Sequence, residues 1–116
     1  VKQPDRGISG GDGGGHSIGG DVYAAKYIQN GRVICAYGSG DSYTGGGAPE
    51  QMTLTISLFY GGTGLAQSSP TTFGLTYMST ETDCVGAGNG VYTVYAYANA
   101  YWTDGTSLNA AGHTSV

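Results

Sequence analysis

Apolar and polar residues alternate with a period of two along much of the chain, a pattern that predicts β-strands. The clearest stretch is residues 51–60, where one face is apolar and the other is polar except for Phe59. The apolar face consists of Met52, Leu54, Ile56, Leu58 and Tyr60. The pattern therefore predicts a strand with one buried face over residues 51–60.

The longest alternating stretch is residues 91–102, and both of its faces carry large side chains. Val94, Trp102 and several alanines lie on one face. The other face includes Tyr95, Tyr97 and Tyr101. Alternation alone does not decide which face is buried. If the tyrosines are exposed, they form a flat aromatic strip that can meet a sugar ring or another protein.

Two turn signals predict hairpins. Asn30-Gly31 favours a two-residue type I′ turn between residues 22–29 and 32–38. The expected partners are Ile28 with Val33 and Tyr27 with Ile34.

The second turn signal is Asp104-Gly105, where a two-residue turn would pair Trp102 with Ser107. That register would place Leu108 on the tyrosine face. Either the loop is longer, or both faces of this sheet are covered.

These elements predict an all-β chain, because no stretch shows a helical apolar period of useful length. Residues 38–50 are rich in glycine and are expected to form a loop, and residues 67–72 a loop or an edge. Residues 73–77 are expected to form a short strand. The predicted fold is a small antiparallel β-sandwich, immunoglobulin-like or similar, with about six or seven strands and one disulfide.

Residues 90–107, GVYTVYAYANAYWTDGTS, resemble the closing hairpin of secreted bacterial immunoglobulin-like modules. The resemblance implies a secreted sandwich module. Some immunoglobulin domains carry a tryptophan between their two cysteines. This chain departs from that pattern, because Trp102 follows both cysteines.

The first 21 residues differ from the rest in their high glycine content, which predicts an extended arm ahead of a sandwich domain over residues 22–116. The arm can pack on its own domain or on a neighbouring subunit. Its candidate apolar anchors are Val1, Ile8 and Ile18.

Cys35 and Cys84 are the only cysteines, and their spacing does not fit a zinc or thioredoxin site. A disulfide between them is expected to stabilise the fold by about 4 kcal/mol, because it closes a long loop. It implies an oxidising compartment. The alternative is a pair of buried thiols in a reducing compartment.

Catalytic motifs are sparse. Residues 15–19 match G-x-S-x-G, but the motif needs a strand before it and a helix after it, and neither is predicted here. We therefore expect no enzyme, no catalytic residue, no cofactor and no metal site.

Charge and hydropathy exclude further classes. The net charge is −4 with only four basic residues, which argues against a nucleic-acid groove. No apolar run is long enough for a transmembrane helix, and no basic leader opens the chain, so any signal peptide is expected to be removed already.

These features together predict an extracellular or cell-surface protein without enzymatic activity. The first hypothesis is a self-assembling, pilus-like surface or fibre subunit that contacts copies of itself through the arm. The second is a carbohydrate-binding module that uses Tyr95, Tyr97, Tyr101 and Trp102. The third is a secreted inhibitor or toxin that presents residues 38–50.

Overall fold

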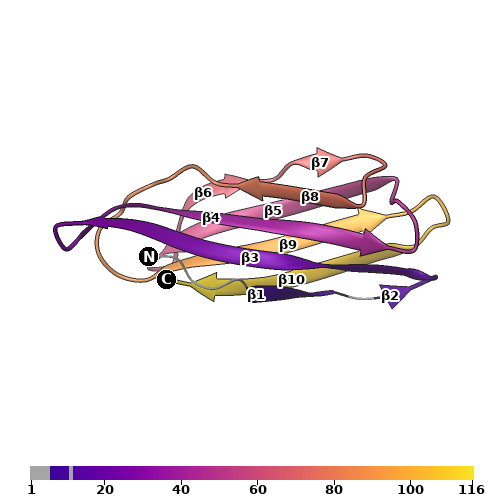
Figure 1. The fold of residues 1–116 in the computed structure, drawn as a ribbon, viewed down its shortest axis with the longest axis horizontal. Coiled ribbons are helices and arrows are strands. Elements are labelled where there is room, and N and C mark those ends of the chain that lie inside the picture. Colours follow the sequence, from indigo (N-terminus) through magenta and orange to yellow (C-terminus); the bar gives the residue numbers. More distant parts are fainter. Residues whose placement is uncertain (1–5, 11) are drawn as a thin grey trace.

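Two antiparallel β-sheets pack face to face along an elongated body with extents of 53 × 20 × 20 Å (Figure 1). The computed structural model describes residues 6–10 and 12–116. These residues form ten strands and no helix, so the all-β sandwich prediction is confirmed, although with more strands than the expected six or seven. None of the described residues belongs to a helix that could cross a membrane.

The first sheet has the order β1-β3-β4-β8, with β2 paired to β3. Its strands are β1 (Arg6–Gly10), β2 (Asp12–Gly13), β3 (His16–Gln29), β4 (Arg32–Gly45) and β8 (Tyr77–Glu81). The second sheet has the order β6-β5-β9-β10, with β7 paired to β5. Its strands are β5 (Gln51–Tyr60), β6 (Thr63–Ser68), β7 (Thr71–Thr72), β9 (Tyr92–Tyr101) and β10 (Ser107–Ser115).

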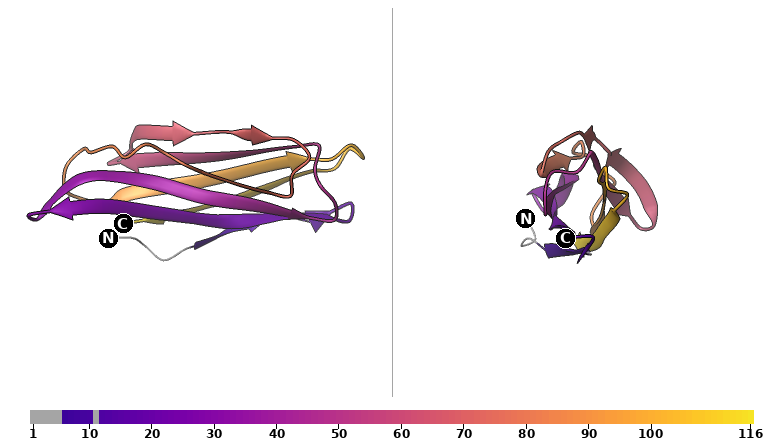
Figure 2. Two further views of the ribbon diagram at one scale, coloured as in Figure 1. Left: turned by 45° about the horizontal axis from the view of Figure 1, so that its top comes forward. Right: turned by 90° about the vertical axis from the view of Figure 1, so that its right-hand side faces the viewer.

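Strand β1 joins the two sheets along one side of the sandwich. Its first residues pair with β3, where Ile8 lies opposite Gly20, and its last pair with β10, where Gly10 lies opposite Ala110. On the other side, Ser68 of β6 and Thr80 of β8 share a hydrogen bond of 2.6 Å between their hydroxyls. The end-on view in Figure 2 shows the strands arranged around a central axis.

The second sheet contributes most of the large side chains in the core, and the first sheet contributes mainly small residues. The large inward side chains of β5 are fully buried, and they are Met52, Leu54, Ile56 and Leu58. The inward positions of β3 and β4 that face them carry mainly small residues, among them Gly20, Ala24, Ala36, Gly38, Gly40 and Ser42. Large side chains from one sheet therefore occupy the space above glycines in the other.

This packing overturns the expected loop over residues 38–50, because β4 continues as a strand to Gly45. A Cβ atom added to Gly38 would lie 2.6 Å from Cγ1 of Val94, and one added to Gly40 would lie 2.7 Å from Cδ1 of Ile56. Glycine is thus required here by close packing between sheets and not by a turn. The connection that remains is residues 46–50.

The predicted Asn30-Gly31 turn is confirmed, since both residues have positive φ angles, 53° and 73°. Ile28 pairs with Val33 as expected. The predicted pairing of Tyr27 with Ile34 is wrong, because a β-bulge shifts the register and Tyr27 lies opposite Cys35.

The second hairpin has a three-residue loop rather than a two-residue loop. The amide of Trp102 donates to the carbonyl of Thr106 at 2.9 Å, and Gly105 adopts a φ of 91°. Leu108 consequently pairs with Ala100 and packs against the core. The longer loop is therefore the correct alternative.

The segment after β5 is an edge of the second sheet, because residues 63–68 and 71–72 form β6 and β7. Of the two alternatives expected for residues 67–72, the edge is therefore the correct one. The expected strand over residues 73–77 is wrong, because Gly74 turns the chain with a φ of 69°. Phe73 and Leu75 lie outside strands and are exposed, and β8 begins only at Tyr77.

The described part of the predicted arm packs on its own chain. Strand β3 begins at His16, so the predicted boundary between residues 21 and 22 falls inside a strand. Ile8 and Ile18 are each 6% exposed and belong to the core. Val1 lies outside the described residues. The glycines of this region are therefore strand positions as well as turn positions.

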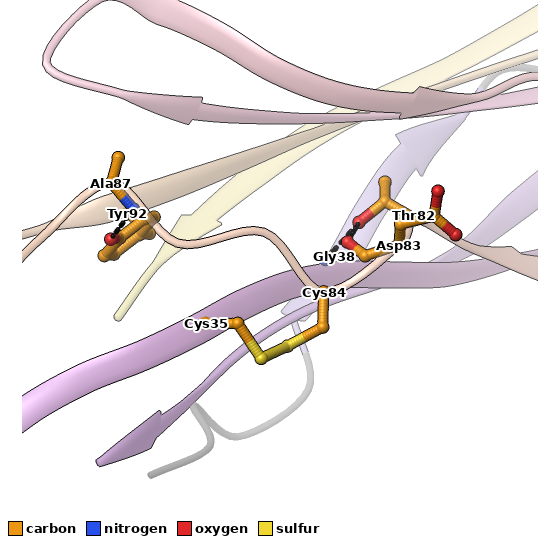
Figure 3. The surroundings of a disulfide bond; sticks show 7 residues. All are labelled: Cys35, Gly38, Thr82, Asp83, Cys84, Ala87 and Tyr92. Atoms are coloured by element: carbon orange, nitrogen blue, oxygen red, sulfur yellow. Dashed lines mark hydrogen bonds between the residues drawn. A yellow bond between two sulfur atoms is a disulfide. The ribbon is translucent and has the colours of Figure 1, made fainter. Parts of the chain in front are cut away.

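The predicted disulfide between Cys35 and Cys84 is present, with Cα atoms 5.3 Å apart (Figure 3). It fastens the connection between β8 and β9 to strand β4. Beside it, the Thr82 amide donates to the Gly38 carbonyl at 2.8 Å, and Val85 and Ala36 exchange two backbone hydrogen bonds. The disulfide is compatible with an extracellular location.

Candidate functional site

The strands of the second sheet carry no acidic residue, lysine or arginine. Strands β5, β6, β7, β9 and β10, all within the described residues, contain no Asp, Glu, Lys or Arg. The charged strand residues belong to the first sheet, and they are Arg6, Asp12, Asp21, Lys26, Arg32, Asp41 and Glu81. The two sheets of the sandwich are thus chemically different.

Strand β9 places three tyrosines at the centre of this uncharged surface. Tyr95, Tyr97 and Tyr101 are 49%, 47% and 37% exposed, whereas Ala96 and Ala98 between them are buried. This settles which face of residues 91–102 is inside. Three of the inward residues of β9 can be alanines because the neighbouring strand β5 supplies much of the volume of the core.

Two further aromatic rings extend the surface sideways from Tyr95. The ring of Phe59 on β5 meets it edge to face, with centroids 5.5 Å apart. The ring of His113 on β10 lies on its other side at 5.4 Å. We call the surface formed by Phe59, Tyr95, Tyr97, Tyr101 and His113 the tyrosine face.

Polar side chains around the tyrosine face are hydrogen-bonded to one another across the strands. Hydroxyl pairs join Thr53 to Thr71 at 2.7 Å, Thr55 to Ser69 at 2.6 Å and Thr93 to Ser115 at 2.8 Å. Donors and acceptors pair as Gln67 to Ser57 at 3.0 Å, Asn99 to Asn109 at 2.7 Å and Tyr101 to Gln51 at 2.7 Å. Within the described part of the chain, the hydroxyls of Tyr95 and Tyr97 have no such partner. The groups left for a ligand therefore include the aromatic rings and the hydroxyls of Tyr95 and Tyr97.

The tyrosine face is hollowed at one end. A cavity of about 450 Å³ there is lined by Phe59, Gly61, Gly62, Thr93 and Tyr95. It lies where β5 turns into β6, at the start of β9. Sequence reasoning did not select Phe59 as a site residue, although its apolar side chain on the polar face of residues 51–60 was the available signal.

Trp102, which we expected beside the tyrosines, lies inside the sandwich. It is 4% exposed, and its Nε1 donates to the Gly47 carbonyl at 3.0 Å. Its indole stacks on the imidazole of His16 with centroids 4.3 Å apart. Trp102 therefore fastens the end of the sandwich and does not belong to the tyrosine face.

His16 also contacts Asp104, and the two side chains connect the start of β3 to the β9–β10 loop. The His16 Nε2 and Asp104 Oδ2 atoms are 2.7 Å apart. The Thr106 amide, which donates to Asp104 at 2.9 Å, and the contact with His16 lower the pKa of that carboxyl to about 2. The G-x-S-x-G stretch, residues 15–19, runs from the β2–β3 turn into strand β3, and no helix follows it.

The outer face of the first sheet has a different chemistry. It has a hollow of about 610 Å³, whose lining includes Tyr23, Tyr77, Asp41 and Glu81. The Tyr77 hydroxyl donates to Asp41 at 3.3 Å. Across the described ranges, no three His, Cys, Asp or Glu side chains are grouped so as to hold a metal ion.

Comparison with protein families and with curated sequences adds no relative. The chain matches no protein-family model, and it has no significant similarity to a curated protein sequence. The resemblance of residues 90–107 to immunoglobulin-like modules thus stays an expectation.

Proposed function

We propose that this protein is a non-enzymatic extracellular module that binds an uncharged polysaccharide through its tyrosine face. The observation that carries the proposal is the row of Tyr95, Tyr97 and Tyr101, exposed on a sheet face without any charged residue. Tyrosine combines a flat apolar ring with a polar hydroxyl. Sugar rings have the matching character, with C–H groups on their faces and hydroxyls at their edges.

The spacing of the tyrosines favours a polymer over a single sugar. Side chains two residues apart on a strand are separated by about 7 Å, so Tyr95 and Tyr101 are separated by about 20 Å. A ligand that contacts all three rings has to be extended in one direction. The hydrogen bonds among the surrounding polar side chains hold the surface in place before a ligand arrives, which lowers the entropic cost of binding.

The test is retention of the purified protein on insoluble uncharged polysaccharides. We expect the double variant Tyr97→Ala and Tyr101→Ala to lose retention while keeping the melting temperature of the wild type. A matched control is Tyr43→Ala with Tyr77→Ala, since those two tyrosines are equally exposed on the first sheet. Equal loss in both double variants, or no retention of the wild type on any polymer, rules the proposal out.

A second candidate function, assembly of copies into a surface or pilus-like fibre, is favoured by the position of β1. This five-residue strand completes the join between β3 and β10, and Ile8 fills a socket between Gly20 and Gly112. The same strand supplied by a neighbouring copy would make the same contacts, and a chain of such exchanges forms a filament.

The register offers a direct test of strand exchange, because Ser9 of β1 lies opposite Ala111 of β10. Cysteines introduced at these two positions will form a disulfide within one chain if β1 pairs with β10 of its own chain. They will link separate chains if β1 is exchanged, and a non-reducing gel distinguishes the two. Monomeric bands alone contradict assembly by β1.

The third hypothesis, a secreted inhibitor or toxin, depended on a long exposed loop over residues 38–50. Since residues 38–45 belong to β4, the segment available for such a role shrinks to residues 46–50.

A further inference from the structure

The cavity at the end of the tyrosine face has the character of a sugar subsite. We propose that it binds the terminal sugar of the polysaccharide, so that the protein recognises chain ends as well as chain surfaces. This inference rests on the proposed function, and it adds a specificity that the row of tyrosines alone would not give.

The walls of the cavity are an aromatic corner. Phe59 and Tyr95 meet with an angle of 87° between their ring planes, so they present one ring face and one ring edge at right angles. A sugar placed in this corner can stack on one ring while its side lies against the other. The cavity volume of about 450 Å³ falls within the range of small-ligand sites.

The remaining wall is a turn made of glycines. Gly61 and Gly62 have φ angles of 56° and 82°, and a Cβ atom added to either would meet no atom within 4 Å. The turn therefore lines its side of the cavity with backbone and no side chain. Any other residue here would be strained by the positive φ.

The cavity is continuous with the row of tyrosines through Tyr95, which belongs to both. A polymer that lies along β9 from Tyr101 past Tyr97 reaches the cavity at Tyr95. The face ends there, because β5 stops at Tyr60 and β9 begins at Tyr92. Position at the end of the row is what assigns the cavity to a terminal sugar.

The lining also defines the charge of the ligand. Phenylalanine, glycine, threonine and tyrosine side chains are all neutral at physiological pH. The Thr93 hydroxyl is already hydrogen-bonded to Ser115 at 2.8 Å. An uncharged pyranose with apolar ring faces, such as a β-1,4-linked glucose unit, fits this lining, whereas a uronic acid would bury a carboxylate without a partner.

The experiment compares β-1,4-glucan preparations of different chain length at equal sugar mass. Shorter chains supply more ends, so we expect the amount of wild-type protein bound to rise as the chains are shortened. Phe59→Ala should remove this rise, and so should Thr93→Tyr, which fills the cavity from an outward strand position. Tyr101→Ala, the matched control at the far end of the row, should weaken binding to all preparations and keep the rise.

The outcomes separate the two proposals. Binding that follows sugar mass and ignores the number of ends overturns the terminal subsite and leaves the polysaccharide module standing. A rise that persists in both cavity variants overturns it as well. Failure of the wild type to bind any glucan, chitin or other uncharged polymer contradicts the proposed function itself.

Discussion

The ring of Phe59 meets the ring of Tyr95 edge to face across strands β5 and β9, with centroids 5.5 Å apart on the outside of the sandwich. An apolar contact of this kind usually lies in a core, and here it forms part of a surface with no charged residue. Exposed apolar patches on small domains commonly mark binding sites. The predictions below follow from this surface and from the packing that supports it.

Binding through the tyrosine face should be insensitive to salt. Attraction between exposed charges is screened as ionic strength rises, whereas ring stacking is not. We expect wild-type retention on an uncharged polysaccharide to be the same in dilute buffer and at about 1 M salt. A steep fall in retention with salt would contradict binding by ring stacking on the tyrosine face.

Gly38→Ala should destabilise the fold, although Gly38 lies in a strand where alanine is ordinarily preferred. The added Cβ would lie 2.6 Å from Cγ1 of Val94. Overpacking of this kind costs about 1–3 kcal/mol. Chemical denaturation measures the loss, with Ser39→Ala, the next residue and outward-facing, as the control. Equal stability of the two variants would mean that the sheets are farther apart than described.

Removal of the disulfide should lower the free energy of unfolding by about 4 kcal/mol, since Cys35 and Cys84 have a sequence separation of 49. The double variant Cys35→Ala and Cys84→Ala tests this without a reductant. The measurement is a urea titration of both proteins at one temperature. An unchanged midpoint would show that Thr82 and Val85 alone hold the β8–β9 connection in place.

The hydrogen bonds of the Asp104 carboxylate with Thr106 and His16 should make stability depend on acid pH. The pKa of Asp104 is lowered from 3.8 to about 2, first by the Thr106 amide and then by His16. The charged carboxylate therefore stabilises the folded state above pH 3.8, and this contribution disappears as the pH falls towards 2. In Asp104→Asn the contribution is absent, so the difference in stability between wild type and variant should shrink over that interval. A constant difference would contradict the lowered pKa.

How far the sequence determines this fold is clearest in β4 and β5. The alternation of residues 51–60 predicted β5 correctly because its inward side chains are large. Strand β4 was mistaken for a loop beyond residue 38, because Gly38 and Gly40 are inward residues whose space is filled by Val94 and Ile56. The need for glycine at these two positions comes from side chains of the opposite sheet, so the local sequence pattern does not predict it.

The candidate site was only partly predictable, because it too depends on contacts between strands. The period of two grouped Tyr95, Tyr97 and Tyr101 on one face, but which face was buried depended on the volume supplied by β5. Trp102 lies on the same face of residues 91–102 as the buried alanines, so grouping it with the tyrosines was wrong. The edge-to-face contact of Phe59 with Tyr95 needs the register between β5 and β9, which the sequence does not specify.

The most direct measurement of the polysaccharide-binding claim is chemical modification of exposed tyrosines with and without bound polymer. Nitration followed by peptide mass spectrometry reports each ring separately. Protection of Tyr95, Tyr97 and Tyr101, with Tyr43 and Tyr77 modified as readily as in the free protein, is the predicted result. Protection of Tyr43 and Tyr77 instead, or of no tyrosine in protein that the polymer retains, would contradict the assignment of the tyrosine face.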